Sequence, residues 1–172
     1  MSIDQVKDKY FIRSRNKILT FDTEGNYLYN ISGIGQGNKE YVNLSSFFIK
    51  NEELCIYDFN QGRVLFFAPS SRYLRTEKAV KNSDVECAPQ LIRPYGKNKY
   101  IAKNSFNGTP GYVTPALSLL DEKYTITQTL EGHSLHTGFL LFDFMNCDDN
   151  GGFITYWEAL SDTIYTVVND SM

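Results

Sequence analysis

A stretch of roughly fifteen residues occurs twice in this chain, and the repeat limits the possible folds more than any single residue does. Residues 17–31 (KILTFDTEGNYLYNI) align without a gap with residues 63–77 (RVLFFAPSSRYLRTE), so that matched positions are 46 residues apart. Phe21 then aligns with Phe67, and both copies place an aromatic residue six positions later. The chain therefore contains at least one duplicated structural unit.

Two further copies of the repeat are weaker. One occupies Ala116–Leu130, and Asp162–Val168 resembles the beginning of another. Repeats of roughly 40–50 residues that are composed of short strands are typical of β-propellers, in which each repeat forms one four-stranded sheet, or blade. We therefore predict an all-β chain, a β-propeller of antiparallel blades with about three and three-quarter blades present. We expect a single domain over residues 1–172, with blades at about 1–32, 45–79, 90–130 and 138–172.

The composition agrees with this fold class. Apolar residues make up 42% of the chain, and 12 Tyr and 12 Phe accompany a single Trp. Aromatic side chains suit the pleated, half-buried surface of a sheet. No segment shows a sustained apolar period of 3.6 residues, so we expect essentially no long helix.

Charge and hydropathy exclude several classes of protein. The net charge of −3 is small and the basic residues are dispersed, which argues against a nucleic-acid partner. No apolar run approaches the roughly 18–20 residues of a transmembrane helix. The first ten residues have neither the basic nor the apolar part of a signal peptide. The chain as written is thus expected in the cytoplasm, or in the periplasm or at the cell surface if a leader has been removed.

Local signals place some turns and strands. Thr23–Asn26 is expected to form a hairpin turn in which Gly25 and Asn26 supply positive φ angles. An insertion at Phe106–Pro115 explains why the third copy lies further along the chain. The run FLLFDFM at Phe139–Met145 is expected to be the first strand of the fourth blade.

A glycine-rich segment follows the first hairpin. A dinucleotide-binding fingerprint needs a third glycine and a following helix, because the helix N-terminus holds the pyrophosphate. Here Asn38 takes the place of that glycine and a strand follows. We therefore predict a structural loop between blades, in which Glu40 bonds to backbone amides and Tyr41 packs between blades. Its residues are Gly33, Gly35, Gln36, Gly37, Glu40 and Tyr41.

The hairpin and this loop together resemble a known family of six-bladed β-propellers with NHL-like repeats, found among exported proteins of Bacteroides-type bacteria. In that family an F-D-x-x-G-x-[FY] hairpin leads into G-x-G-Q-G-x-x-E-Y. The matching residues are Phe21, Asp22, Gly25, Tyr27, Gly33, Gly35, Gln36, Gly37, Glu40 and Tyr41, with Trp157, Asp162, Ile164 and Tyr165 near the end. The resemblance implies the fold and a cell-envelope setting, and it carries over no catalytic residue. Family members are about twice as long, so the chain would be a member truncated to about four blades.

Two histidines stand before the expected fourth blade. His133 and His136 have an H-x-x-H spacing in a predicted loop, and Asp143 is the candidate third ligand nearby. Bound zinc usually has three or four protein ligands, so surface or channel-mouth imidazoles are the competing interpretation. If the protein binds a small molecule, we expect the site at these three residues.

Other reactive residues give weaker signals. The three cysteines form no C-x-x-C pair, and Cys55 in ELCIYDF reads as a buried apolar residue. The run CDDNGG at 147–152 lacks the spacing of a calcium loop and reads as a hairpin turn. No G-x-S-x-G motif is present.

We therefore predict a non-catalytic binding or scaffolding propeller of the bacterial cell envelope, without metal or cofactor. Its partner is expected to be a protein or a glycan, and exposed blade faces would allow a homo-oligomer. One alternative is a lyase or hydrolase whose site lies at the channel mouth near His133 and His136. Another is a fragment of a larger propeller without an independent function.

Overall fold

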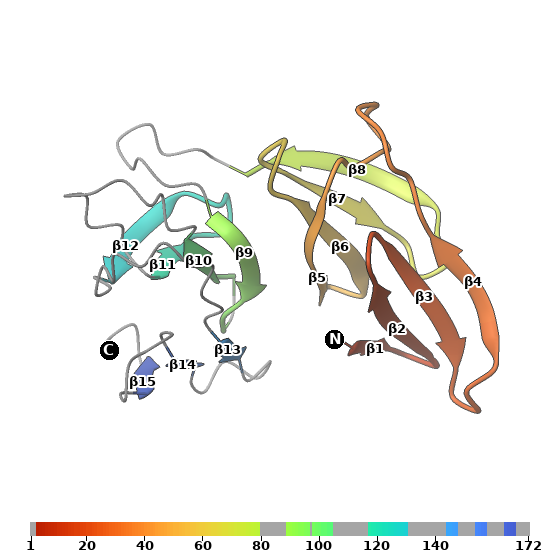
Figure 1. Cartoon of the computed structure of the whole chain (residues 1–172), viewed down its shortest axis with the longest axis horizontal. Coiled ribbons are helices and arrows are strands. Elements are labelled where there is room, and N and C mark those ends of the chain that lie inside the picture. Colours follow the sequence, from red (N-terminus) through yellow and green to blue (C-terminus); the bar gives the residue numbers. More distant parts are fainter. Residues whose placement is uncertain are drawn as a thin grey trace, which may run out of the picture. The chain divides into compact units, whose positions relative to one another are not determined.

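The structure, a computed structural model, describes residues 3–79, 89–96, 98–104, 117–130, 144–147, 154–157 and 164–167. All regular elements in these ranges are β-strands (Figure 1). Within the same ranges, no helix is long and apolar enough to cross a membrane.

The strands of the described ranges form three four-stranded sheets and one three-stranded sheet, all antiparallel. Sheet 1 contains β1 (Ile3–Val6), β2 (Lys9–Ser14), β3 (Lys17–Asp22) and β4 (Tyr27–Ile31). Sheet 2 contains β5 (Leu44–Lys50), β6 (Glu53–Asp58), β7 (Arg63–Phe67) and β8 (Tyr73–Lys78). Sheet 3 contains β9 (Pro89–Pro94), β10 (Tyr100–Asn104), β11 (Leu117–Leu120) and β12 (Ile126–Leu130). Sheet 4 contains β13 (Phe144–Cys147), β14 (Ile154–Trp157) and β15 (Ile164–Val167).

Within each sheet, every strand pairs with the next one in the chain, which is the strand order of a propeller blade. The predicted fold class, an all-β chain with about three and three-quarter propeller blades, is confirmed. The chain divides into two compact units, Met1–Ala79 and Val80–Met172. The single domain over residues 1–172 stays a prediction.

The sequence repeat is reproduced in the strand register. Phe21 pairs with Tyr27 across a β-bulge in sheet 1, and Phe67 pairs with Tyr73 across the same bulge in sheet 2. The two ring pairs have nearly the same edge-to-face geometry, with centroids 5.9 and 5.8 Å apart. Sheet 3 has its bulge at the corresponding place, next to Leu120. The gapless alignment of the first two copies is therefore also a structural alignment.

The turns before these bulges share one backbone path. In all three, a residue with positive φ donates its N–H to the carbonyl three residues before it: Gly25 to Asp22, Ser71 to Ala68 and Tyr124 to Asp121. This is the turn in which a left-handed residue creates a bulge. The prediction of a positive φ at Gly25 is confirmed, whereas the one at Asn26 is wrong. Asn26 instead donates its backbone N–H and its side-chain amide to the carboxylate of Asp22.

These bonds also change the acidity of the Asp22 carboxyl group. The hydrogen bonds from the Asn26 side chain and backbone lower the pKa of Asp22, because they stabilise its charged form. The Asp121 carboxylate accepts the N–H groups of Lys123 and Thr125 in the equivalent turn of sheet 3. Sheet 2 has Ala68 at this position and therefore lacks this carboxylate cap.

The first strand of the fourth repeat is described only in part. We predicted a strand at Phe139–Met145, and β13 (Phe144–Cys147) overlaps the end of this range. Residues 139–143 lie outside the described ranges, so the start of the strand stays a prediction.

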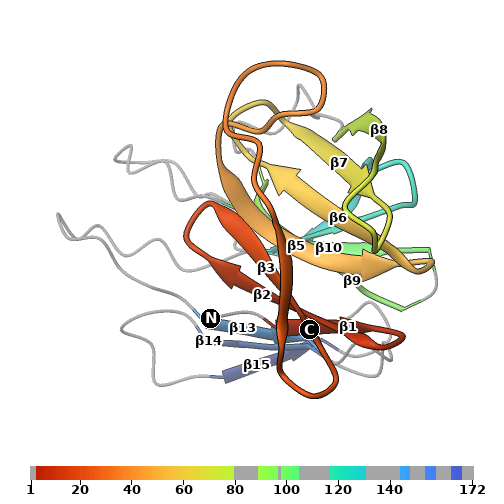
Figure 2. The ribbon, with the colours of Figure 1, turned by 90° about the vertical axis from the view of Figure 1, so that its right-hand side faces the viewer.

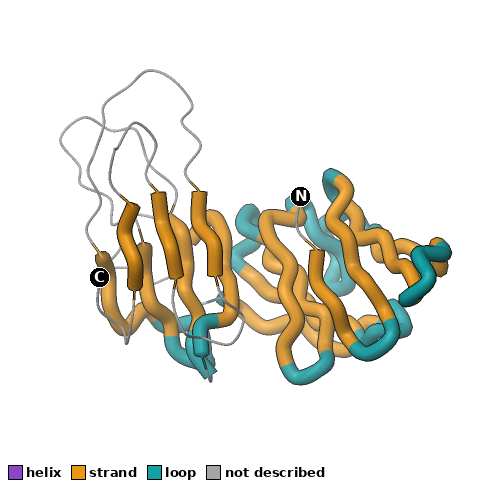
Figure 3. The backbone as a smooth tube through the Cα atoms, turned by 90° about the horizontal axis from the view of Figure 1, so that it is seen from below, coloured by secondary structure: helices purple, strands orange, loops and turns teal. Residues whose placement is uncertain are grey.

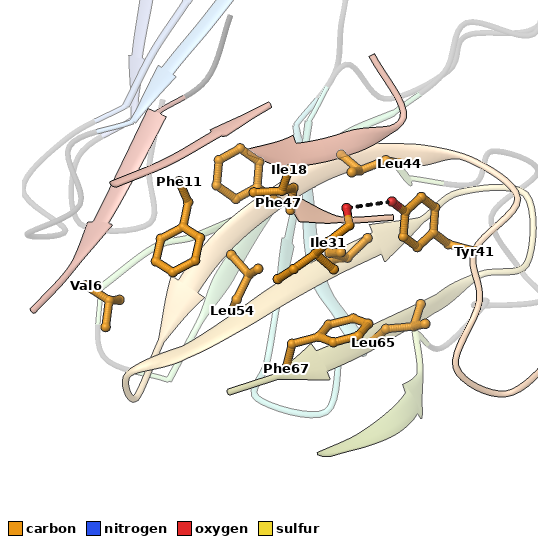
Figure 4. Packing of buried hydrophobic residues seen from close by; sticks show 11 residues of the cluster. Val6, Phe11, Ile18, Ile31, Tyr41, Leu44, Phe47, Leu54, Leu65 and Phe67 are labelled. Atoms are coloured by element: carbon orange, nitrogen blue, oxygen red, sulfur yellow. Dashed lines mark hydrogen bonds between the residues drawn. The ribbon is translucent and has the colours of Figure 1, made fainter. Parts of the chain in front are cut away.

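Sheets 1 and 2 pack face to face, and their contact is the apolar core of the first unit (Figure 4). Every second residue of a strand points into the contact, because neighbouring side chains of a strand point to opposite faces of the sheet. The buried members are Val6, Phe11, Ile18 and Ile31 from sheet 1, Leu44, Phe47, Leu54, Ile56, Leu65 and Phe67 from sheet 2, and Tyr41 from the connection. Full burial of such side chains stabilises the fold by about 1.5–3 kcal/mol each.

Polar contacts join the two sheets around this core. Arg13 donates a hydrogen bond from Nη1 to the carbonyl of Ser45 at 2.7 Å. The Tyr29 hydroxyl donates to the carbonyl of Pro69. Figure 3 shows turns and loops at both ends of these strands. At one end Lys7 and Glu52, in the β1–β2 and β5–β6 turns, form an exposed ion pair.

Replacement of Leu65 by Ala should test the importance of the core contact. Leu65 is fully buried between the two sheets. Its truncation removes apolar contacts and leaves a cavity, so we expect a loss of about 2–5 kcal/mol in the free energy of unfolding. Chemical denaturation monitored by circular dichroism measures this loss. The control is Lys17→Ala on exposed β3 surface, which should change stability by no more than about 0.5 kcal/mol. Equal effects of both variants would contradict this description of the core.

Candidate functional site

Three connections that are far apart in sequence lie together at one end of sheets 1 and 2. We call residues 15–16, 33–43 and 59–62 the loop end. The Gln61 side-chain amide donates to the carbonyl of Gly35, and the Asn43 amide donates to the side chain of Asn60. Figure 2 shows the segment between β4 and β5 as an orange loop that extends beyond the end of β5. The predicted structural loop between blades is thus the largest part of this end.

The loop closes on itself through backbone hydrogen bonds. The N–H of Gly35 donates to the carbonyl of Tyr41, and the N–H of Tyr41 donates to the carbonyl of Gly33. The Glu40 carboxylate accepts the N–H of Gly37 at 2.9 Å. A Cβ atom at Gly35 would overlap this carboxylate, and one at Gly37 would lie 3.0 Å from it. A side chain at Gly35 or Gly37 would therefore have to displace the Glu40 carboxylate from the backbone.

Side chains of sheet 2 also form hydrogen bonds with this loop. The Arg63 guanidinium donates from Nη2 to the carbonyls of Gly37 and Glu40, at 2.9 and 2.6 Å. The Thr76 hydroxyl donates to the carbonyl of Asn38 at 2.9 Å. These bonds satisfy loop carbonyls that would otherwise need water, and they fix the loop over β7 and β8.

A buried carboxylate secures the end of the loop. Asp58 is fully buried and accepts N–H groups from Val42, Asn43, Asn60 and Gln61, at 2.8, 3.3, 3.1 and 3.4 Å. Sequence reasoning did not find this residue. The available signal was an acidic residue at the end of an apolar strand, directly before an Asn-Gln-Gly turn. A buried charge of this kind is stable because several donors replace its water.

Tyr41 anchors the loop in the core between the two sheets. Its ring is fully buried, and its hydroxyl lies 2.7 Å from the carbonyl of Asn16 and 3.3 Å from that of Ile31 (Figure 4). Burial raises the pKa of Tyr41, because it disfavours the phenolate. The residue therefore acts as a neutral donor that ties the loop to sheet 1.

The loop presents one apolar side chain to solvent. Ile34 is 66% exposed, although its neighbours in the loop are held by the bonds described above. Gln36, Asn38 and Lys39 are also exposed. The backbone at this position is restrained by a parallel bridge between Ile34 and Tyr41. An apolar side chain on a restrained loop is suited to contact with another molecule.

The predicted ligand-binding residues cannot be placed relative to this end. His133, His136 and Asp143 lie outside the described residues, as do 148–152 of the CDDNGG run. The site at these histidines stays a prediction. Among the described residues, no group of three or more His, Cys, Asp or Glu side chains is placed to hold a metal ion.

Cys55 is unsuited to nucleophilic chemistry. It is fully buried in β6, where burial raises the pKa of its thiol well above the usual value. The reactive form of cysteine is the thiolate, which this environment disfavours. The interpretation of Cys55 as a buried apolar residue agrees with its surroundings.

Sheet 3 carries a shallow hollow at one end. It has a volume of about 430 Å³ and is lined by Asn98, Lys99, Leu120, Asp121, Glu122, Lys123 and Thr127. The carboxylate of Asp121 is already bonded to the backbone of its own turn. The hollow is open to solvent, and all of its lining residues except Leu120 are polar or charged.

Comparison with known proteins gives the following matches. A family model described as a 6-bladed beta-propeller matches residues 1–172. A solved protein of Bacteroides fragilis, described as exported, superimposes with a TM-score of 0.74 at 17% identity, over 96% of this chain and 46% of its own. A Bacteroides caccae protein of unknown function superimposes with a TM-score of 0.51 at 14% identity, over 76% of this chain and 48% of its own. The chain thus spans about half of each structure. No curated protein sequence matches it.

The contact between Gly35 and Glu40 predicts a non-additive pair of substitutions. Glu40→Ala removes the bond to Gly37 and should cost about 1 kcal/mol of stability. Gly35→Ala displaces the same carboxylate and should cost a similar amount. In the double variant no carboxylate remains to be displaced, so its stability should equal that of Glu40→Ala. Urea denaturation of the four proteins measures the coupling. Additive losses would show that the clash does not involve Glu40.

The burial of Cys55 predicts slow thiol chemistry. In a Cys87→Ser/Cys147→Ser protein, Cys55 should react with a thiol reagent only as fast as the protein unfolds. The reaction should become fast in denaturant, which serves as the internal control. Rapid labelling of the folded protein would contradict the assigned environment of the thiol.

Proposed function

The chain belongs to the 6-bladed beta-propeller family, and on this premise we propose that it is a non-catalytic binding module that recognises a protein partner through its loop end. The observation that carries the proposal is the exposure of Ile34 on a loop whose backbone is bonded to both sheets. A restrained loop loses little conformational entropy when a partner covers it. An aliphatic side chain at its tip favours a protein surface over a glycan, since glycan sites rely on polar groups and aromatic faces.

The charged groups at this end support binding rather than catalysis. Asp58 is bonded to four backbone amides, Glu40 to the amide of Gly37, and Arg63 to two carbonyls. Each of these groups stabilises the loop conformation. General acid–base catalysis needs a group that can reach a substrate and exchange a proton with it. These three charged groups therefore maintain the shape of the loop end.

The proposal includes a location in the cell envelope. It is supported by the similar Bacteroides fragilis protein, which is described as exported. A function in the envelope also fits a module that presents a fixed surface to another protein. Fractionation of source cells, followed by detection of the chain in cytoplasmic and envelope fractions, tests this part of the proposal.

Binding through Ile34 can be tested with a matched pair of variants. Wild-type protein is immobilised, polypeptides captured from an extract of source cells are identified, and each candidate is purified and titrated by calorimetry. Ile34→Glu should raise the dissociation constant at least about tenfold, because it places a charge in the apolar centre of the contact. Ile164→Glu is the control, since Ile164 is 67% exposed and belongs to β15 rather than to the loop end.

Three outcomes would overturn the proposal. In the first, no purified candidate binds the wild type. In the second, both variants weaken binding equally, so that the loop end has no special role. In the third, the wild type binds purified glycans and Ile34→Glu leaves that affinity unchanged.

A further inference from the structure

The carboxylates at and beside the loop end already have partners within the chain. Glu40 accepts the N–H of Gly37, and the buried Asp58 accepts four backbone N–H groups. Glu77, near the end of adjoining β8, forms an ion pair with Arg75 at 2.8 Å. The negative charge of this region is therefore used to hold the protein's own groups.

Four cations at the same end are exposed. Arg15 and Lys39 belong to the loop end, and Lys17 directly follows its first segment. Lys78 lies at this end as well, because it pairs across the strands with Arg63, which bonds to the loop. Within the described ranges, none of these four exposed side chains belongs to an ion pair. The loop end thus presents positive charge to solvent.

The opposite end of sheets 1 and 2 carries exposed charges of both signs. Asp8, Glu24 and Arg72 lie in its turns, and Lys7 is paired there with Glu52 at 2.7 Å. The whole chain has a net charge of −3. The positive charge of the loop end is therefore a local feature of the surface and does not follow from the composition.

The positive charge occurs on the same loop as the exposed apolar side chain. Lys39 follows Ile34 in this loop, and its ammonium group lies 5.7 Å from the centroid of the Tyr73 ring. Contact with an aromatic face attracts a cation and restricts its position. The loop end thus combines one exposed aliphatic side chain with positioned positive charge.

We propose that the loop end binds an acidic polypeptide segment that carries an apolar residue among its carboxylates. The argument is charge complementarity: Asp and Glu side chains of the partner pair with the exposed cations, and its apolar residue covers Ile34. This inference rests on the binding function proposed above and adds the chemistry of the partner. Nucleic acid is the weaker candidate, because binding to phosphates gives an exposed aliphatic side chain no role.

Selection from a display library of random peptides tests the chemistry of the partner. The full chain is immobilised, and peptides that also bind Ile34→Gln are discarded, since this variant removes the apolar contact without adding charge. The remaining peptides should contain Asp and Glu at about twice the frequency of the unselected library or more. Equal frequencies would overturn this inference and leave binding through Ile34 intact. Loss of every peptide in the discarding step would overturn both proposals.

Charge reversal at the two ends of the sheets provides a matched pair of variants. A selected acidic peptide is titrated by calorimetry against Lys39→Glu and Arg72→Glu, which change the net charge equally. Lys39→Glu should raise the dissociation constant at least about tenfold, whereas Arg72→Glu should change it less than about twofold. Both positions are exposed, so both variants should fold as the wild type does. Equal effects would overturn the assignment of the acidic segment to the loop end.

The salt dependence of the same titration gives a second readout. Salt screens exposed charges, so the dissociation constant should rise at least about tenfold from low to high ionic strength. An affinity that does not depend on salt would overturn the proposal. Displacement of the peptide by single-stranded DNA or by anionic lipid vesicles at lower concentration would also overturn it, because the surface would then prefer phosphate to carboxylate.

Discussion

The apolar contact between sheets 1 and 2 is the interaction on which the rest of the first unit depends. An isolated small sheet with one apolar face in water is marginally stable, so each sheet needs a cover. Phe11 and Ile18 from one sheet and Phe47 and Leu54 from the other supply it. Only when these faces meet do the turns at Asn16 and Gln61 come close enough to hold the loop between them.

The polar groups of the loop end are consequences of that packing. Tyr41 reaches the carbonyl of Asn16 because the core holds its ring, and Asp58 reaches the amides of Val42 and Asn43 because β5 and β6 are paired. Arg63 then occupies carbonyls that the loop would otherwise expose to water. Each bond contributes modestly on its own, but together they leave the loop few alternative conformations. A surface of this kind is already organised before a partner arrives.

Sequence reasoning predicted the parts of the fold that depend on local patterns. The alignment of Phe21 with Phe67 predicted equal registers, because a repeat in the side-chain pattern fixes which face each residue occupies. The strand predicted at Phe139–Met145 overlaps β13, and its first five residues lie outside the described ranges. Asp58 was not found because its partners at Val42 and Asn43 come from the connection before its neighbouring strand. The site at His133 and His136 stays a prediction. The exposure of Ile34 could not be predicted either, because a loop has no regular alternation of buried and exposed side chains.

The turns at the sheet bulges share one backbone path although their side chains differ. Gly25, Ser71 and Tyr124 occupy one left-handed backbone position with three unrelated side chains. Tyr124 adopts this conformation with its ring buried against Tyr100, at a centroid distance of 4.6 Å. Left-handed geometry costs a residue other than glycine about 1–2 kcal/mol, so the rest of each hairpin enforces it. The blades of one chain can thus differ in composition while these turns keep the same backbone path. Recognition of distant blades by residue identity alone then fails before recognition by shape does.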